Sequence, residues 1–203
     1  MARYGTEHKA HTRQRIIETA GRRLKQNGID GSGVAALMTD AGLTNGAFYA
    51  HFESKDDLVA HVVAEQLANQ RDVLAALPEG RAALEQFVHE YLSPQHRDDP
   101  GKGCPNAALL DEIGRCGDAV RDSYTRGMQS IVEVIATHLS PGDPAAARST
   151  ALGLFTVLVA TMQLARAVSD RELSDDILES GISNAQRLLG YEQPDTAVER
   201  IVT

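Results

Sequence analysis

The chain has 203 residues, of which 42% are hydrophobic, and a formal net charge of −8 at pH 7. This length and apolar content can bury a substantial core, which argues against a disordered chain. Two cysteines and the lack of a basic, apolar leader favour a cytoplasmic, reduced protein over a secreted disulfide scaffold. The run 151–168 is long enough to span a bilayer, but its polar residues favour a buried helix, so no membrane partner is expected.

Charge is distributed unevenly along the chain. Residues 1–25 contain seven Lys and Arg against two Glu, whereas residues 56–203 carry a net −11. A basic segment of this kind attracts the phosphates of nucleic acid. The attraction acts over about 8 Å at physiological salt, so an acidic body farther away would weaken binding to DNA little. Arg3, Lys9 and Arg13 are therefore expected to form a basic arm on DNA, with a solvated terminus as the alternative.

Apolar residues at helical spacing predict two helices at the start of the chain. The first covers residues 9–27 and ends at Gly28. The second begins at Ser32 or Gly33 and places three apolar residues on one face, namely Val34, Leu37 and Met38.

A tight turn and a short third helix follow. Gly42 can adopt the left-handed conformation that ends the second helix, and Thr44 can cap the third by accepting from its unpaired N–H groups. Phe48 and Phe52, four residues apart, give the third helix a buried face. Residues 33–52 therefore predict a helix-turn-helix, whose opposite face would meet DNA.

The outward face of the third helix contains side chains suited to DNA. Asn45 can donate and accept at once against adenine in the major groove; its alternative role is to help cap the helix. Gly46 lets the backbone approach the groove floor. Tyr49 and His51 can bind phosphates or base edges, the alternatives being packing and solvation. Lys55 lies at a helix N-terminus, where its charge and the unpaired N–H groups both attract phosphate.

Four motifs lie in order between residues 13 and 58: Ala41-Gly42-Leu43-Thr44, Phe48-Tyr49, His51-Phe52 and Ser54-Lys55-Asp56-Asp57-Leu58. This order resembles the N-terminal domain of the TetR/AcrR-type transcriptional regulators. The resemblance implies a DNA-binding domain over residues 9–69 and an effector-binding and dimerisation domain over residues 70–203. It also implies DNA contacts by Thr44, Asn45, Gly46, Tyr49, His51 and Lys55, to which we add Ser32 and the basic arm.

The rest of the chain is expected to be helical. Ser54 and the acidic residues after it predict a capped fourth helix that extends to about Leu77. At about 30 Å, this helix is long enough to connect a DNA-reading head to a separate body. Beyond Gly80 every segment has helical periodicity, so the expected fold is all-α with about nine helices.

The last two helices are expected to form a homodimer interface. The eighth is apolar on nearly every side, and the ninth, capped by Ser174, mixes large residues with small ones such as Gly181. Another helix can approach such a surface closely, and TetR-like proteins usually dimerise through a four-helix interface of this kind. The polar stretch 93–103 is expected to be a mobile loop, and the tail after Tyr191 to fray.

Several apolar or amphipathic side chains in the C-terminal part could line a cavity for a small, apolar effector. Ordinary core packing is the alternative for all of them. They are Phe87, Tyr91, Cys104, Leu110, Tyr124, Met128, Phe155 and Met162.

Cys104 precedes Pro105, which suits the first position of a helix, so Cys104 would be the cap. A helix N-terminus favours a thiolate, and some redox-sensing or electrophile-sensing TetR-like proteins resemble this placement; the alternative is a small residue that lines a pocket. Cys116 is expected to be inert. His8 and His11 lack a third ligand nearby, so no metal site is expected. Neither a catalytic arrangement nor a cofactor motif is evident, so an enzyme is not expected.

The resulting hypothesis is a homodimeric, ligand-responsive transcriptional regulator, most simply a repressor, that binds a palindromic operator. Two alternatives stay open. One is a thiol-based redox or electrophile sensor that uses Cys104. The other is a helical interaction protein whose predicted recognition face binds a protein partner instead of DNA.

Overall fold

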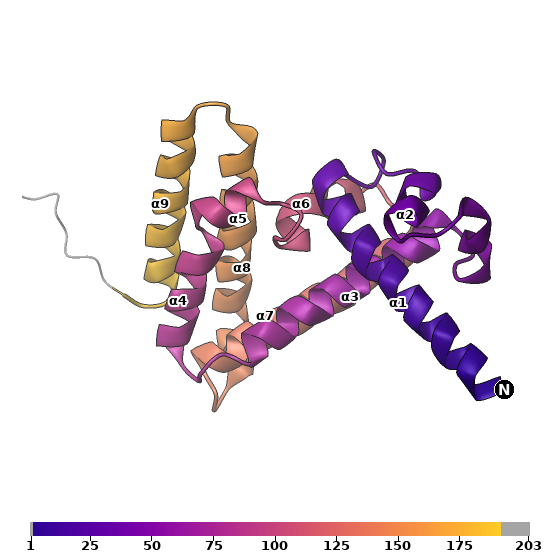
Figure 1. The fold of residues 1–203 in the computed structure, drawn as a ribbon. Helices are drawn as coiled ribbons and strands as arrows, with labels where there is room; N and C mark the ends of the chain where they lie inside the picture. The colour runs from indigo at the N-terminus through magenta and orange to yellow at the C-terminus, as the bar shows by residue number, and fades with distance from the viewer. Residues whose placement is uncertain (1, 192–203) are drawn as a thin grey trace, which may run out of the picture.

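The computed structural model describes residues 2–191, and every regular element in that range is a helix (Figure 1). The all-α prediction is confirmed, with one element more than expected. In chain order the elements are α1 (Ala2–Asn27), α2 (Val34–Asp40), the 3₁₀ helix η1 (Asn45–Ala50), α3 (Lys55–Ala75), α4 (Arg81–Tyr91), α5 (Pro94–Asp98), α6 (Pro105–Ile113), α7 (Asp118–Leu139), α8 (Pro144–Ala167) and α9 (Arg171–Leu188).

Helices α1, α2 and η1 pack with the first half of α3 to form a small N-terminal head (Figure 1). Fully buried side chains from all four elements form its core: Ile16, Leu24, Leu37, Phe48, Leu58 and Val62. Helix α1 begins at Ala2, well before the predicted start at residue 9. Arg3, Lys9 and Arg13 therefore belong to one continuous helix, and their contact with DNA stays a prediction.

Helix α3 runs from the head into the body and packs along α7 (Figure 1). The Ser54 hydroxyl accepts from the Asp57 N–H at 3.0 Å, so the predicted cap is confirmed. With 21 residues at 1.5 Å each, α3 is about 30 Å long. The two helices approach closely where Gly127 of α7 faces Leu67 of α3.

Helices α8 and α9 lie side by side and antiparallel at the far end of the body (Figure 1). Gly181 of α9 faces the Thr161 side chain of α8, and a Cβ at Gly181 would overlap it. The close approach predicted for Gly181 is therefore used within the chain and not for a symmetry mate.

The segment predicted as a mobile loop, residues 93–103, contains α5 and is tied to its surroundings. The Arg97 side chain is buried and bonds to Ser174 at 2.8 Å and Asp175 at 2.5 Å. Ser174 is also not the cap of α9, because Asp170 accepts from the first N–H groups of that helix. The sequence pattern could not show that Ser174 and Arg97, far apart in the chain, bind each other.

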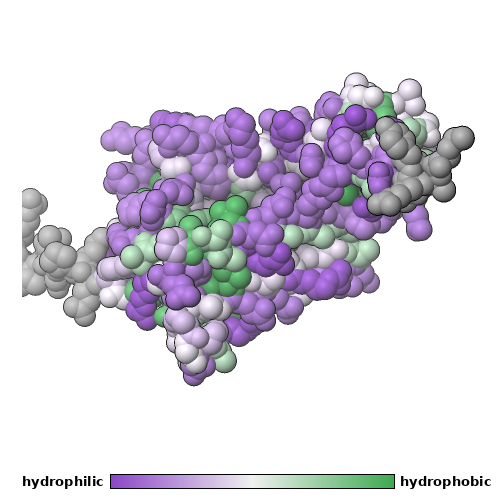
Figure 2. All heavy atoms as spheres, turned by 60° about the horizontal axis from the view of Figure 1, so that its bottom comes forward, coloured by the Kyte–Doolittle hydropathy of each residue, from purple (hydrophilic) through white to green (hydrophobic). Residues whose placement is uncertain are grey.

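Helix α8 is long and apolar enough to cross a membrane by length and composition, and only 39% of its apolar window is buried in the chain. The core helix of a globular protein can have the same length and apolar composition, so this is weak evidence for a membrane span. Leu152 and Leu164 of α8 are exposed, as is Leu173 at the start of α9. The face on which α4 and the α7–α8 turn come forward is largely hydrophilic, with one group of hydrophobic side chains on the body (Figure 2).

Candidate functional site

The turn between α2 and η1 is fixed by its own backbone. Gly42 has φ = 68°, the left-handed conformation predicted for it. Its N–H bonds to the Thr39 carbonyl, and the Leu43 N–H bonds to the Met38 carbonyl, both at 2.9 Å. This is a Schellman motif, in which the reversed bonds satisfy the last carbonyls of the helix. The direction in which η1 leaves the turn is therefore well defined.

The recognition segment is a 3₁₀ helix held by aromatic side chains. Phe48 is fully buried, and its ring lies 5.7 Å from Phe52 and 5.2 Å from Tyr49. Tyr49 is nevertheless 75% exposed. Thr44 takes the cap position without a side-chain hydrogen bond, so the predicted hydroxyl cap is wrong. The structure brings four of the predicted contact residues to one exposed surface, which comprises Thr44, Asn45, Gly46 and Tyr49.

Two other predicted contact residues are used inside the head. Ser32 is fully buried, and its hydroxyl donates to the Gly28 carbonyl at 2.7 Å, so a side-chain contact of Ser32 with DNA is excluded in this conformation. Lys55 is half-buried, and its ammonium donates to the Ile29 carbonyl at 2.5 Å. Both side chains satisfy carbonyls of the α1–α2 connection. The Lys55 contact joins residues 26 positions apart, so no local pattern could reveal it.

Three of the remaining predicted contact residues, Lys9, Arg13 and His51, lie close enough to interact or to share a neighbour. The Arg13 guanidinium stacks over the Phe52 ring at 4.7 Å, and Lys9 is exposed. The Arg3 side chain lies outside the described part of the structure. His51 is half-buried with a buried Nδ1 that has no partner among the described residues. Burial lowers the pKa of His51, and the charges of Lys9 and Arg13 lower it further.

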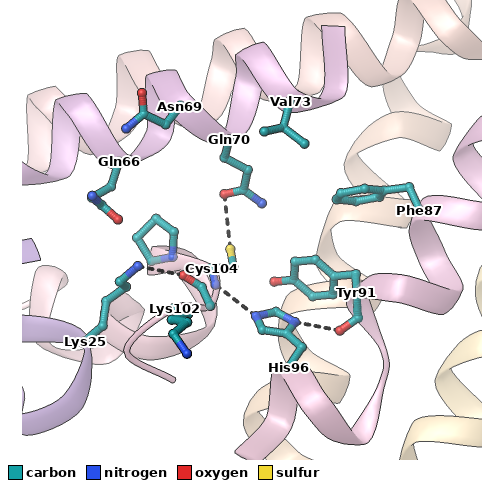
Figure 3. Close-up of a pocket in the computed structure, with 12 residues that line it drawn as sticks. Lys25, Gln66, Asn69, Gln70, Val73, Phe87, Tyr91, His96, Lys102 and Cys104 are labelled. Atoms are coloured by element: carbon teal, nitrogen blue, oxygen red, sulfur yellow. Dashed lines mark hydrogen bonds between the residues drawn. The ribbon is translucent and has the colours of Figure 1, made fainter. Parts of the chain in front are cut away.

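A cleft of about 290 Å³ lies between the head and the body (Figure 3). It is lined by Lys25, Gln66, Asn69, Gln70, Val73, Phe87, Tyr91, His96, Lys102, Gly103, Cys104 and Pro105. Phe87, Tyr91 and Cys104 were predicted to line a cavity. The polar lining residues were missed, because they come from α1, α3 and the α5 region and have no shared sequence signal.

The other predicted cavity residues do not line this cleft. Met162 is fully buried in the core, and Phe155 lies in the packed region between α3 and α8. Leu110, Tyr124 and Met128 are partly buried against the same core. For these five residues the alternative of core packing fits, since helical periodicity identifies an inward face but does not separate a cavity wall from a packed contact.

Cys104 is the cap residue of α6, as predicted, and its side chain is buried. The thiol donates to Gln70 Oε1 at 3.1 Å and accepts from Asn106 Nδ2 at 3.2 Å. Cys116 is half-buried, and burial raises the pKa of its thiol. Cys104 is thus the thiol that faces the cleft.

His96 links the cleft wall to the Cys104 backbone (Figure 3). Its Nε2 accepts from the Cys104 N–H at 2.9 Å, which requires Nδ1 to hold the proton and to donate to the Tyr91 carbonyl at 2.6 Å. The head reaches the same region through Lys25, whose ammonium donates to the Gly103 carbonyl at 2.9 Å. Residues of α1, α5 and the start of α6 thus form one connected set of hydrogen bonds.

Residues 16–62 match the family model described as "Bacterial regulatory proteins, tetR family". Curated TetR-type regulators and solved structures of the same fold match over longer stretches. The N-terminal domain of the chain, which contains these residues, belongs to the TetR family.

Among curated relatives of this chain, the HTH-type transcriptional repressor DhaR of Mycobacterium sp. (strain GP1) is 26% identical over 115 residues, covering 56% of this chain and 58% of DhaR. The probable HTH-type transcriptional regulator ArpR of Pseudomonas putida is 34% identical over 132 residues, covering 65% of this chain and 54% of ArpR. The chain thus spans little more than half the length of these relatives. The reduced form of Escherichia coli NemR shares the fold, with a TM-score of 0.74 at 18% identity over 87% of this chain and 96% of NemR.

The stability of this protein is expected to fall in mild acid through His96. Burial lowers the pKa of His96, and the charges of Arg166 and Lys25 lower it further. The folded chain therefore binds the proton more weakly than the unfolded chain, whose histidine pKa is about 6.5. The contribution of neutral His96 is fully present above that pH and is lost as the pH falls through the lower folded-state pKa.

Thermal unfolding at pH 7.5 and pH 5.5 tests this expectation. The drop in Tm between the two pH values should be smaller for His96→Gln than for the unmodified chain. His89→Gln, an exposed position on α4, serves as the matched control and should keep the full drop. An equal drop in all three proteins would show that His96 does not contribute.

Proposed function

We propose that this chain is a ligand-responsive transcriptional repressor that binds a palindromic operator as a homodimer. The observation that supports this best is the exposed surface of η1, where Asn45 and Tyr49 face outward from a segment held by buried Phe48. A short helix on a rigid support is the usual device for reading bases in a major groove. The DNA-binding unit proposed is residues 9–69, and its target implies a cytoplasmic location.

In this proposal the two heads of a dimer enter successive major grooves, about one helical turn apart. Asn45 reads a base edge, Thr44 and Tyr49 bind the backbone or base edges, and Gly46 allows close approach. Lys9, Arg13 and His51 lie beside this surface and supply further contacts. Lys55 contributes only if phosphate displaces its hydrogen bond to the Ile29 carbonyl.

The proposed dimer interface is formed by α8 and α9. Leu152, Leu164 and Leu173 are large apolar side chains that one chain leaves exposed on these helices, with exposed fractions of 37%, 58% and 47%. Covering them with the same surface of a second chain gives an interface with two-fold symmetry and buries apolar area that otherwise faces water.

The effector site proposed is the cleft in the C-terminal unit, residues 70–203, closed on one side by α1 and α3 of the head. A small molecule with an apolar part would pack against Phe87 and Tyr91. Binding changes operator affinity if the ligand has a higher affinity for a conformation in which the two heads no longer match the groove spacing.

A titration of the protein on a palindromic DNA fragment at several salt concentrations tests the proposed function. Affinity should fall steeply with salt, because each neutralised phosphate releases a counterion. Leu164→Glu should shift the protein towards monomer in sedimentation and weaken operator binding, while Thr137→Glu on α7 should do neither. A folded dimer that binds no DNA at low salt would favour the alternative of a protein-interaction module.

A thiol switch is a second candidate function, favoured by the position of Cys104 in the cleft beside Lys25, His96 and Tyr91. In this alternative, the Cys104 sulfur adds to one carbon of an activated C=C bond, the π bond breaks, and the thiol proton is transferred to the other carbon. The adduct then disturbs the hydrogen bonds of the cleft wall. N-ethylmaleimide should then release the protein from DNA. Cys104→Ser should abolish this release and Cys116→Ser should not; release that survives Cys104→Ser would exclude the thiol switch.

A further inference from the structure

The cleft has an excess of positive charge on its wall. Its lining includes Lys25 and Lys102 but no Asp or Glu. Lys102 is exposed and pairs with Asp99 at 3.1 Å, so its charge is already compensated. Lys25 has no such ion pair among the described residues, and its ammonium bonds to the neutral Gly103 carbonyl. An ammonium has three N–H donors, so Lys25 can also bind an anion.

The surroundings of Lys25 favour an anionic ligand. Burial lowers the pKa of Lys25, and the charges of Arg22 and Arg166 lower it further, although Asp99 acts in the opposite direction. A carboxylate placed beside the ammonium would offset the free-energy cost of keeping Lys25 protonated in this position, because an opposite charge stabilises the protonated form. The site therefore gains more from a negatively charged ligand than from a neutral one of the same shape.

Tyr91 provides a second polar point in the cleft. The residue is only 6% exposed, and its hydroxyl has no hydrogen-bond partner among the described residues. Figure 3 shows the hydroxyl directed into the cleft, on the side of Cys104. Burial, and then the nearby Cys104 thiol, raise the pKa of Tyr91, so the hydroxyl keeps its proton and can donate. A buried hydroxyl without a hydrogen bond costs the protein stability. A ligand oxygen that accepts from this hydroxyl would remove the cost.

The opposite end of the cleft is apolar. Val73 is 60% exposed although it is a large apolar residue, and Phe87 packs beside Tyr91 with ring centroids 5.7 Å apart. In Figure 3, Val73 and Phe87 lie at the end away from Lys25, with Tyr91 between. The volume of about 290 Å³ is just below the range of about 300–1,000 Å³ found for ligand pockets, so the ligand must be small.

We propose that the cleft binds a small monocarboxylate with an apolar, preferably aromatic, body. The carboxylate accepts from Lys25, an oxygen in the middle of the ligand accepts from Tyr91, and the apolar body covers Val73 and Phe87. A phosphate is disfavoured, because its second charge would meet one available ammonium and no arginine fork on the cleft lining. This inference rests on the proposed role of the cleft as the effector site.

The position of Lys25 connects this ligand to the DNA-binding head. Lys25 belongs to α1, and its present partner, Gly103, lies just before α6 of the body. A carboxylate bound to the same ammonium changes the strength and geometry of its hydrogen bond to the Gly103 carbonyl. Ligand binding therefore acts on a hydrogen bond between head and body. The interaction energy of the ligand then differs between the arrangement in which this bond is intact and one in which it is broken.

Calorimetric titration of the full chain with three probes tests the proposal. The probes are 4-oxo-4-phenylbutanoate, its neutral amide, and 4-phenylbutanoate, which lacks the ketone. The first probe should bind about 10-fold or more tightly than the amide, because hydrogen bonds to charged groups are the stronger ones. Lys25→Met should remove this preference, while Arg22→Met, an exposed charge on the same helix, should keep it.

A comparison of the two acids tests the proposed hydrogen bond from Tyr91. The ketone should improve affinity over 4-phenylbutanoate by a few-fold in the unmodified chain, and Tyr91→Phe should abolish that gain. Equal binding of the acid and the amide, an unchanged preference in Lys25→Met, or no binding of any probe at millimolar concentration would overturn the proposal. If Lys25→Met does not fold, loss of the acid preference in Lys25→Gln decides the same point.

These titrations contain no DNA, so their outcome is separable from that of the proposed function. Operator binding without carboxylate binding would refute the ligand class alone. Carboxylate binding by a chain that binds no DNA would refute the repressor alone.

Discussion

Asn45→Ala should weaken binding to the operator by about 10- to 100-fold while leaving binding to random DNA nearly unchanged. Asn45 is exposed at the first position of η1 and follows Thr44, whose hydroxyl does not cap the helix. Its amide can donate to and accept from an adenine edge at once, and such a bidentate contact contributes about 1–3 kcal/mol of discrimination. Neighbouring Gly46 has no side chain to hold the helix away from the groove floor.

Competition binding with operator and random duplexes at one salt concentration measures this effect. Gln129→Ala, an exposed amide on α7 in the body, is the matched control and should bind both duplexes normally. Equal weakening on both duplexes would mean that Asn45 binds the DNA backbone and reads no base. Unchanged binding to both would remove Asn45 from the interface.

Gly127→Ala should destabilise the protein, although alanine is the better helix former. The added Cβ would lie 2.5 Å from Leu67 Cδ1 and 2.7 Å from Leu67 Cβ. Leu67 is fully buried, and its Cβ is fixed to the α3 backbone, so the helices must move apart. Overpacking of this kind costs about 1–3 kcal/mol, against a helix-propensity gain of up to about 1 kcal/mol.

Thermal unfolding shows whether the cost of overpacking or the gain in helix propensity is larger. Gly153→Ala lies in the interior of α8, where the new Cβ would be 3.7 Å from Leu188, an ordinary contact. That variant should be as stable as the unmodified chain or more stable, whereas Gly127→Ala should lower Tm by several degrees. A stabilised Gly127→Ala would show that α3 and α7 are less tightly packed than described.

The head was largely predictable because its signals are local. Gly42 has the left-handed φ that a helix stop requires, and Ser54 caps α3 through its own near neighbour, Asp57. Phe48 and Phe52, four residues apart, turn to the same buried side, and this leaves Asn45 outside. Each of these features involves residues within one helical turn, so the sequence pattern contains the whole interaction.

Predictions failed where a side chain binds a distant part of the chain. Lys55 has the position of a phosphate-binding residue at a helix N-terminus, yet its ammonium donates to the Ile29 carbonyl, 26 residues away. The polar stretch around Arg97 is typical of a loop, but the Arg97 side chain forms an ion pair with Asp175 of another helix. Polarity alone does not tell whether a charged group meets water or a partner far away in the sequence.

The sequence by itself determined the helices, the turn of the recognition motif and the residues on its outer face, because spacing and capping act over a few residues. The cleft was decided only by the tertiary structure. Lys25, Gln70, Tyr91 and Cys104 belong to four segments with no shared periodicity, and their contacts exist only when α1, α3 and the region from α4 to α6 pack together. The residue spacing of one helix determines which side chains form its exposed binding surface. A binding surface formed by four segments depends on how the buried faces of those segments pack together.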